Sequence, residues 1–202
     1  PESANHPIIS IAIRKNDGNY WVWGLNDYTP SRQDVLFIRC DNEMDLIRKF
    51  VDHWQNYGPD IITGWNTRFF DIPYIVNRCY KLFGDDTLLK RLSPWGLVRE
   101  RKQKINGQEN QEYIIDGIEH LDYLEVFKKF TLNTIGRLES YRLDFVANVV
   151  LGERKLSYEE HGNLHTLYKE DYQKFIDYNV KDVELVHKID EKLDLISLVL
   201  TM

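Results

Sequence analysis

The chain has 202 residues, a formal net charge of −6 at pH 7, 43% hydrophobic residues and 13% aromatic residues. That length suits one large domain or two small ones, and no apolar run is long enough to cross a bilayer. The acidic balance argues against a protein that wraps duplex DNA through bulk positive charge. The two cysteines, Cys40 and Cys79, lack the spacing of a zinc site.

The first forty residues are predicted to form three strands. Alternating apolar residues indicate strands at 8–13, 20–25 and 35–38. Asp17-Gly18 is a turn signal between the first two strands. We expect the three strands to pair as a meander.

Helices and strands alternate from residue 43 onward. The pattern predicts a helix over 43–57, a buried strand over 60–63 and a helix over 71–83. A short strand ending at Leu121 is followed by a helix that Asp122 caps. Further helices are expected around 143–150 and from Asp171 to the end of the chain. This alternation indicates an α/β layer fold.

A β-hairpin is predicted over 99–115. Asn106-Gly107 is a strong signal for its turn. Its first arm carries Arg99, Arg101 and Lys102. As solvated charges they would protect an edge strand from aggregation, and replacing Arg101 and Lys102 with alanine would leave stability nearly unchanged.

Asp182 is the most informative residue of the last helix. It falls on the same helix face as five apolar residues, Phe175, Val186, Ile189, Leu193 and Ile196. Tyr178 lies one turn before it on that face. Because burying an unpaired carboxylate is costly, Asp182 is either bonded to a neighbouring group or bound to a metal. The helix alone leaves both interpretations open.

A second acid, Asp71, lies where a strand gives way to a helix. Pro73 suits the first turn of that helix, and Asp71 just before it is expected to be the N-cap. Junctions of this kind are also where α/β folds place their chemistry. Nearby Trp65, Asn66 and Phe70 offer flat rings and an amide that suit a nucleotide.

At these residues the sequence resembles family B DNA polymerases, and in particular the replicative polymerases of T-even-like bacteriophages. The second exonuclease motif of that family is similar to Trp65-Asn66 with Phe70-Asp71-Ile72-Pro73-Tyr74. The third is similar to Tyr178-Asn179 with Asp182. The likeness continues in the expected order through connecting segments, namely Arg91-Leu-Ser-Pro94, Leu121-Asp-Tyr123, Lys128-Lys129-Phe130, Ser140-Tyr141 and Leu143-Asp144.

The resemblance implies a 3′→5′ proofreading exonuclease of the ribonuclease H-like fold. Such a fold has a central mixed sheet flanked by helices, here with the hairpin at 99–115 as an insertion. The implied chemistry is hydrolysis of the 3′-terminal phosphodiester with two divalent cations, Mg²⁺ or Mn²⁺, and release of a nucleotide monophosphate. If the matching residues have the family's roles, Asp182 holds one metal, Asp71 acts at the second, and Tyr178 orients the attacking water.

The resemblance also implies contacts with DNA. Residues expected at the frayed single-stranded 3′ end are Trp65, Asn66, Phe70 and Asn179. In the phage polymerases a hairpin in the corresponding place helps to separate primer from template. Its counterpart here would bring Arg99, Arg101 and Lys102 to DNA phosphates.

The family's first exonuclease motif, an Asp-x-Glu on an early strand, is not found. Residues 1–202 are therefore interpreted as an exonuclease domain that starts after this motif and lacks its N-terminal strand. Two acids are too few to hold two Mg²⁺ ions, so we expect the isolated chain to bind metal weakly and to cleave poorly or not at all.

An alternative from another class is a noncatalytic module that binds single strands or supports a split polymerase. In either case the expected partners are DNA and the remaining polymerase domains, toward which the apolar C-terminal helix would lead. No membrane partner is expected. The expected location is the cytoplasm of a host cell.

Overall fold

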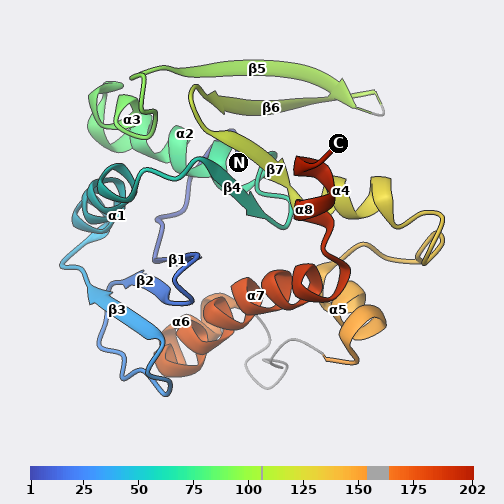
Figure 1. The fold of residues 1–202 in the computed structure, drawn as a ribbon. Helices are drawn as coiled ribbons and strands as arrows, with labels where there is room; N and C mark the ends of the chain where they lie inside the picture. Colours follow the sequence, from blue (N-terminus) through green and yellow to red (C-terminus); the bar gives the residue numbers. More distant parts are fainter. Residues whose placement is uncertain (106, 154–163) are drawn as a thin grey trace. The chain divides into compact units, whose positions relative to one another are not determined.

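The computed structural model of the chain describes residues 1–105, 107–153 and 164–202 (Figure 1). The contacts divide the chain into two compact units. Unit 1 comprises Pro1–Ile8 and Glu43–Phe127, and unit 2 comprises Ile9–Asn42 and Lys128–Met202. Each unit is therefore built from two separate segments of the chain.

Unit 1 contains two long helices, a short helix and four strands. In chain order these are α1 (Glu43–Tyr57), β4 (Ile61–Gly64), α2 (Asp71–Phe83), α3 (Thr87–Lys90), β5 (Val98–Ile105), β6 (Gln108–Ile115) and β7 (Glu119–Asp122), after which α4 (Tyr123–Phe130) begins. The predicted bounds of α1 and α2 are confirmed. One stripe of α1 is buried, and Trp54 at its end donates its ring N–H to the backbone oxygen of Leu92 at 2.8 Å.

Two strand pairings shape unit 1. β4 and β7 pair in parallel, from Ile61 opposite Glu119 to Gly64 opposite Asp122. Because parallel strands end at the same edge, the segments after Gly64 and after Asp122 start side by side. β5 and β6 pair antiparallel from Val98–Ile115 to Ile105–Gln108. Of the two predicted turn residues, Gly107 has a φ of +80°, whereas Asn106 lies outside the described residues.

The described residues of unit 2 form three strands and four helices. These are β1 (Ser10–Arg14), β2 (Tyr20–Gly24), β3 (Val35–Arg39), α5 (Leu143–Leu151), α6 (Leu164–Glu170), α7 (Tyr172–Leu193) and α8 (Leu195–Leu200). β1 pairs antiparallel with β2, as expected, but β3 runs parallel to β2. The predicted meander is therefore wrong at β3, because the connection between β2 and β3 returns the chain to the end of the sheet where β2 began.

The core of unit 2 lies between this sheet and α7. It is built from buried side chains of both, namely Tyr20, Val22, Tyr28, Val35, Ile176 and Val180. Helices α5 and α6 also pack on α7. A helix of 22 residues is thus fixed by a sheet and by two other helices within one unit.

Across the described ranges the strands form a three-stranded mixed sheet and two two-stranded sheets. Each unit has its own pairing: β1, β2 and β3 belong to unit 2, and the other four strands belong to unit 1. The mixed α/β class is confirmed, and the ribonuclease H-like arrangement around a central mixed sheet stays a prediction.

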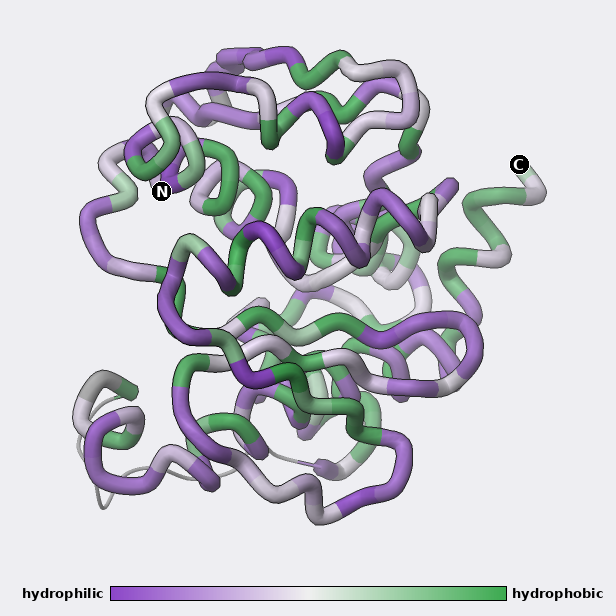
Figure 2. Tube along the Cα trace, turned by 90° about the vertical axis from the view of Figure 1, so that its left-hand side faces the viewer, coloured by the Kyte–Doolittle hydropathy of each residue, from purple (hydrophilic) through white to green (hydrophobic). Residues whose placement is uncertain are grey.

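The helix predicted from Asp171 to the end of the chain is divided into α7 and α8. Asp194 has a φ of +51° and ends α7 in the left-handed conformation. The Asp190 carboxylate accepts bonds from the N–H groups of Leu195 and Ile196, each at 3.1 Å, and so starts α8. Figure 2 shows α8, beside the C-terminal label, as a mostly hydrophobic stretch. Within the described residues no helix is both long and apolar enough to cross a membrane.

Candidate functional site

The loop of residues 65–70 in unit 1 carries three of the predicted DNA contacts. It joins β4 to α2. Asn66 has a φ of +64°, a left-handed conformation that asparagine tolerates better than most residues. The Phe70 ring is 51% exposed and stacks on Tyr74, with ring centroids 6.2 Å apart. Trp65 instead packs inward, and its ring centroid lies 6.2 Å from that of Tyr123.

Asp71 is the first residue of α2 and not its N-cap. The capping position is held by Phe70, which makes no side-chain cap bond. The predicted cap is therefore wrong, because the helical turn begins one residue earlier than expected. The Asp71 carboxylate is exposed in the first turn, where the helix dipole favours negative charge. Pro73 lies in that turn as predicted.

Asp122 is the best-bonded carboxylate of unit 1, and it is 2% exposed. Its Oδ1 accepts from the N–H groups of Leu124 at 3.0 Å and Glu125 at 3.4 Å, which confirms the predicted cap of α4. It also accepts from the neighbouring loop. The N–H of Asn66 donates to Oδ1 at 3.3 Å, and the N–H of Arg68 donates to Oδ2 at 2.9 Å.

Two further residues hold the same loop, and sequence reasoning missed both. The Arg68 guanidinium donates to Glu125 at 2.7 Å and to the backbone oxygen of His120 at 2.9 Å. The His120 ring lies 2.9 Å from the hydroxyl of Thr67. These partners are about fifty residues apart in the sequence, so no local pattern connects them. The one available signal was a cation next to the aromatic residues of the loop.

Helix α7 buries two faces, which changes the interpretation of its apolar stripe. Ile176 and Val180 pack on the sheet of unit 2. At about 100° per residue, Tyr178, Asp182 and Ile189 fall on another face about 150° away. Tyr178 and Ile189 are buried, and Asp182 is half-buried.

The five apolar residues of the predicted face differ in burial. Ile189 is buried, and the other four are half-buried. The apolar spacing indicated one face, whereas the helix buries two. The predicted placement of Asp182 one turn after Tyr178 on one face nevertheless holds, since the helix is continuous from Tyr172 to Leu193.

The predicted site residues form one group in each unit. Trp65, Asn66, Phe70 and Asp71 are together in unit 1, and the group of Tyr178, Asn179 and Asp182 is in unit 2. The Asn179 amide donates to the Ser10 hydroxyl on β1 at 3.0 Å. In the part of the chain that the structure describes, no three or more His, Cys, Asp or Glu side chains are arranged to hold a metal. A cation pocket shared by Asp71 and Asp182 stays a prediction.

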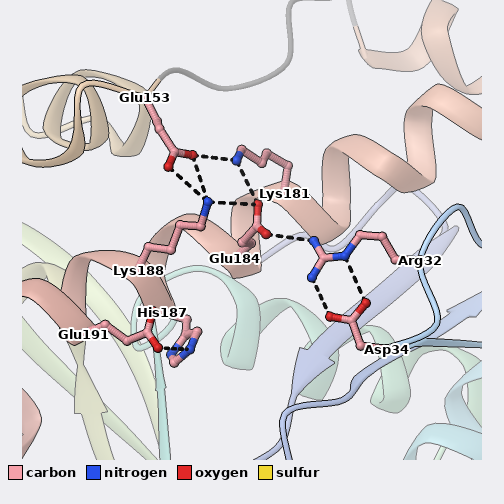
Figure 3. Close-up of polar contacts among 8 residues, drawn as sticks. All are labelled: Arg32, Asp34, Glu153, Lys181, Glu184, His187, Lys188 and Glu191. Carbon is pink, nitrogen blue, oxygen red and sulfur yellow. Dashed lines mark hydrogen bonds and ion pairs between the residues drawn. The ribbon is translucent and has the colours of Figure 1, made fainter.

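A network of ion pairs covers the flank of α7 (Figure 3). Glu184 accepts from Arg32 at 2.7 Å and from Lys181 at 2.8 Å. Glu153, which follows α5, accepts from Lys181 at 2.8 Å and from Lys188 at 3.0 Å. These bonds join α7 both to the end of α5 and to the loop before β3, so they fix the rotation of the helix about its axis.

A shallow pocket of about 250 Å³ lies beside this network. Its lining includes Tyr28, Arg32, Asp177 and Lys181. The Tyr28 hydroxyl donates to Asp177 at 2.7 Å, and burial together with this bond raises the pKa of Tyr28. None of the predicted site residues lines this pocket.

The cations of the hairpin are paired with acids. Arg99 forms two bonds with Asp116, at 2.7 Å and 2.6 Å, and these bonds lower the pKa of Asp116. Arg101 pairs with the buried Glu112 of β6, and Lys102 lies 3.6 Å from Glu100. The expected positive arm is therefore largely neutralised within unit 1.

Comparison with known proteins identifies the class. Residues 1–146 match the exonuclease domain of DNA polymerase family B. The chain belongs to this family.

Three of the relatives are polymerases of two phages and of an archaeon. A DNA-directed DNA polymerase of Enterobacteria phage T4 is 37% identical over 83% of this chain and 18% of its own length. That of Escherichia phage RB69 is 33% identical, with 100% of this chain and 25% of its own length covered. DNA polymerase 1 of Sulfurisphaera ohwakuensis is 31% identical over 94% of this chain and 20% of its own length. The chain thus spans a quarter or less of these relatives.

Proposed function

We propose that this chain is a proofreading exonuclease domain, which hydrolyses the 3′-terminal phosphodiester of single-stranded DNA. The observation that carries the proposal is the placement of Tyr178 and Asp182 one turn apart on one face of α7, in a chain of the family B exonuclease class. That face is separate from the face packed on the sheet. A hydroxyl and a carboxylate in this arrangement suit the orientation of a water molecule beside a cation.

Carboxylates are suitable ligands for hard divalent cations, but two carboxylates are too few for two cations. Oxygen donors suit Mg²⁺ or Mn²⁺, and Asp71 and Asp182 are the acids we assign to them. When bound, two such ions would neutralise the phosphate and lower the pKa of the attacking water. Two carboxylates do not complete two coordination shells, so we expect weak metal binding and slow cleavage from this chain alone.

The DNA end would meet the exposed side of the loop. The exposed Phe70 ring offers a stacking surface for a base, and Asn66 offers an amide beside it. Trp65 supports this surface from within through its packing on Phe127, with ring centroids 5.8 Å apart. Asn179 would contribute from α7, and Arg99, Arg101 and Lys102 from the hairpin would reach phosphates only by exchanging their present partners.

A second function remains open because of the shortage of metal ligands. With no group of three or more ligating side chains among the described residues, the chain would also suit a noncatalytic module that binds single strands within a polymerase. In both cases the partners are DNA and the other domains of a polymerase. The short share of the relatives that this chain covers supports such a larger assembly.

The test compares this chain with a longer natural polypeptide that contains it. Both are incubated with Mg²⁺ and a single-stranded oligonucleotide labelled at its 5′ end. We expect stepwise 3′→5′ shortening and nucleoside monophosphate release by the longer polypeptide, and little by this chain. Asp71→Asn and Asp182→Asn should each stop the shortening, whereas Asp85→Asn in an exposed turn should not. Binding without shortening in every form would favour the noncatalytic module.

A further inference from the structure

We propose that Asp122 and Arg68 are positioning residues that hold residues 65–70 in the conformation that meets the DNA 3′ end. The inference rests on the proposed function, because it assigns these two residues to the support of Asn66 and Phe70. Neither Asp122 nor Arg68 is proposed to touch DNA or a cation. Their effect is transmitted through the backbone of the loop.

The four bonds of Asp122 show why it is a support. A carboxylate has about four lone-pair sites for hydrogen bonds. Here Oδ1 accepts from the backbone N–H groups of Asn66, Leu124 and Glu125, and Oδ2 accepts from the N–H of Arg68. At 2% exposure, Asp122 is inaccessible to solvent cations and to phosphates. A single buried side chain therefore ties the loop to the first turn of α4.

The loop needs such a tie because its backbone is strained at Asn66. A non-glycine residue with a φ of +64° lies in a conformation that persists only where surrounding contacts enforce it. Asp122 enforces it on the upstream side. Downstream, the N–H of Phe70 donates to the oxygen of Asn66 at 3.1 Å, and the N–H of Ile72 donates to the oxygen of Thr67 at 3.0 Å. These bonds connect the loop to the first turn of α2.

Arg68 adds a second tie through its side chain. Its guanidinium bonds to the His120 backbone oxygen on β7 and to Glu125 on α4. It also lies 3.6 Å from Glu112 on β6. Because three elements share this one cation, Arg68 is committed to the protein, and a phosphate would have to displace a carboxylate to reach it.

The residues that support the loop are more buried than the residue that would contact DNA. The supports lie inside, with Asp122 almost fully buried, whereas Phe70 at the end of the loop is half exposed. A change at Asp122 can therefore affect a DNA end only through the loop. This separation makes the proposal testable by a substitution that removes the bond to the Arg68 N–H and keeps the cap.

Asp122→Asn is that substitution. Asparagine is as good an N-cap as aspartate, so its oxygen can still accept from Leu124 and Glu125. Its amide group then replaces Oδ2 and faces the N–H of Arg68, donor against donor. Arg68→Gln tests the second tie, since it keeps the backbone N–H and removes the guanidinium.

Two measurements on the 202-residue chain report on loop and function separately. Amide hydrogen exchange, followed by NMR, should become about tenfold faster at Arg68 in Asp122→Asn and change little at Leu124 and Glu125. The dissociation constant for a single-stranded oligonucleotide with 2-aminopurine at its 3′ end should rise by about five- to tenfold. Arg68→Gln should weaken binding in the same direction.

Controls distinguish positioning from general destabilisation. Asp85→Asn makes the same change in an exposed turn of unit 1, where Asp85 accepts from the N–H of Thr87 at 2.9 Å, and it should alter neither readout. Val126→Ala removes a buried side chain of α4. It should lower thermal stability at least as much as Asp122→Asn but leave oligonucleotide binding within about twofold of the wild type.

Each outcome decides the proposal. Unchanged exchange at Arg68 in Asp122→Asn overturns it, and so does wild-type binding despite faster exchange. Failure of the wild-type chain to bind the oligonucleotide overturns it as well. If the longer polypeptide does not digest DNA but Asp122→Asn weakens binding, the nuclease proposal fails and the positioning role is supported. If Asp182→Asn abolishes digestion while Asp122→Asn digests and binds normally, the nuclease stands and the positioning role falls.

Discussion

The Thr67 hydroxyl and the His120 ring nitrogen Nε2 lie 2.9 Å apart, and this bond joins the loop after β4 to β7. Burial lowers the pKa of His120 to about 4, and nearby Arg68 acts in the same direction. The imidazole is therefore neutral at pH 7. A neutral ring is compatible with the guanidinium beside it, whereas an imidazolium would be repelled.

The pKa of His120 predicts a loss of stability in acid. The folded-state pKa is below the ordinary value of 6.5, so the unfolded chain takes up the proton first as the pH falls. This contribution is constant above about pH 6.5 and is lost between about pH 6.5 and pH 4. Urea unfolding at several pH values should give a shallower pH dependence for His120→Gln. His6→Gln, at an exposed position, should keep the wild-type slope, and an equal slope in both variants would contradict the assignment.

The network on α7 predicts that its two glutamates differ in importance. The Glu184 side chain is 14% exposed and pairs with Arg32 and Lys181, whereas Glu191 is 62% exposed and pairs with His187. Glu184→Gln should lower the free energy of unfolding by about 1–3 kcal/mol, because it weakens charge-assisted bonds of two cations. Glu191→Gln should change it by less than about 0.5 kcal/mol. Chemical denaturation measures both, and similar values would show that the network is not stabilising.

Acid should weaken the same network. Burial alone would raise the pKa of Glu184, but hydrogen bonds from Lys181 and Arg32 outweigh it and lower the pKa. A carboxylate with a lowered folded-state pKa stabilises the fold above its unfolded pKa, and the contribution is lost as the pH falls through the folded value. The difference in stability between the wild type and Glu184→Gln should therefore shrink as the solution is acidified below about pH 4.5. A difference that stays constant down to pH 3 would contradict this.

Local signals in the sequence predicted much of the fold. The bounds of α1 and α2 follow from apolar spacing, and the cap at Asp122 follows from a polar residue before an apolar turn. The helix expected around 143–150 is α5, which Gly152 ends in the left-handed conformation. Each of these helix ends and caps depends on residues that are close in the sequence, so a local sequence pattern is enough to predict it.

Non-local contacts account for what the sequence did not predict. The second role of Asp122 depends on Asn66 and Arg68, more than fifty residues away. The parallel direction of β3 depends on how its loop returns, and the two buried faces of α7 depend on which elements pack there. The break at Asp194 is created by bonds that Asp190 makes across it. The supports of the loop at 65–70 were thus visible only in the fold.

The contacts in the hairpin predict different changes in stability for Arg101→Ala and Lys102→Ala, whereas the sequence predicted nearly unchanged stability for both. Arg101 pairs with Glu112, whose side chain is 3% exposed, whereas Lys102 pairs with Glu100 at the surface. Arg101→Ala should lower the free energy of unfolding by about 1–3 kcal/mol, because it leaves the buried Glu112 carboxylate with only Arg68, 3.6 Å away, as a cation partner. Lys102→Ala should be nearly neutral. Thermal denaturation of the two variants tests this, and equal melting temperatures would show that Arg68 compensates for Arg101.

The last prediction concerns the close contact between Gly64 and Thr67. A Cβ added at Gly64 would clash with the Thr67 methyl group, so Gly64→Ala must displace the Thr67 side chain. We expect a loss of about 1–3 kcal/mol in unfolding free energy and weaker binding of single-stranded DNA. Thr67→Ser removes that methyl and keeps the hydroxyl that bonds to His120. The double variant Gly64→Ala with Thr67→Ser should therefore recover most of both losses. If the double variant is as impaired as Gly64→Ala alone, steric contact at Thr67 is not what requires glycine at this position.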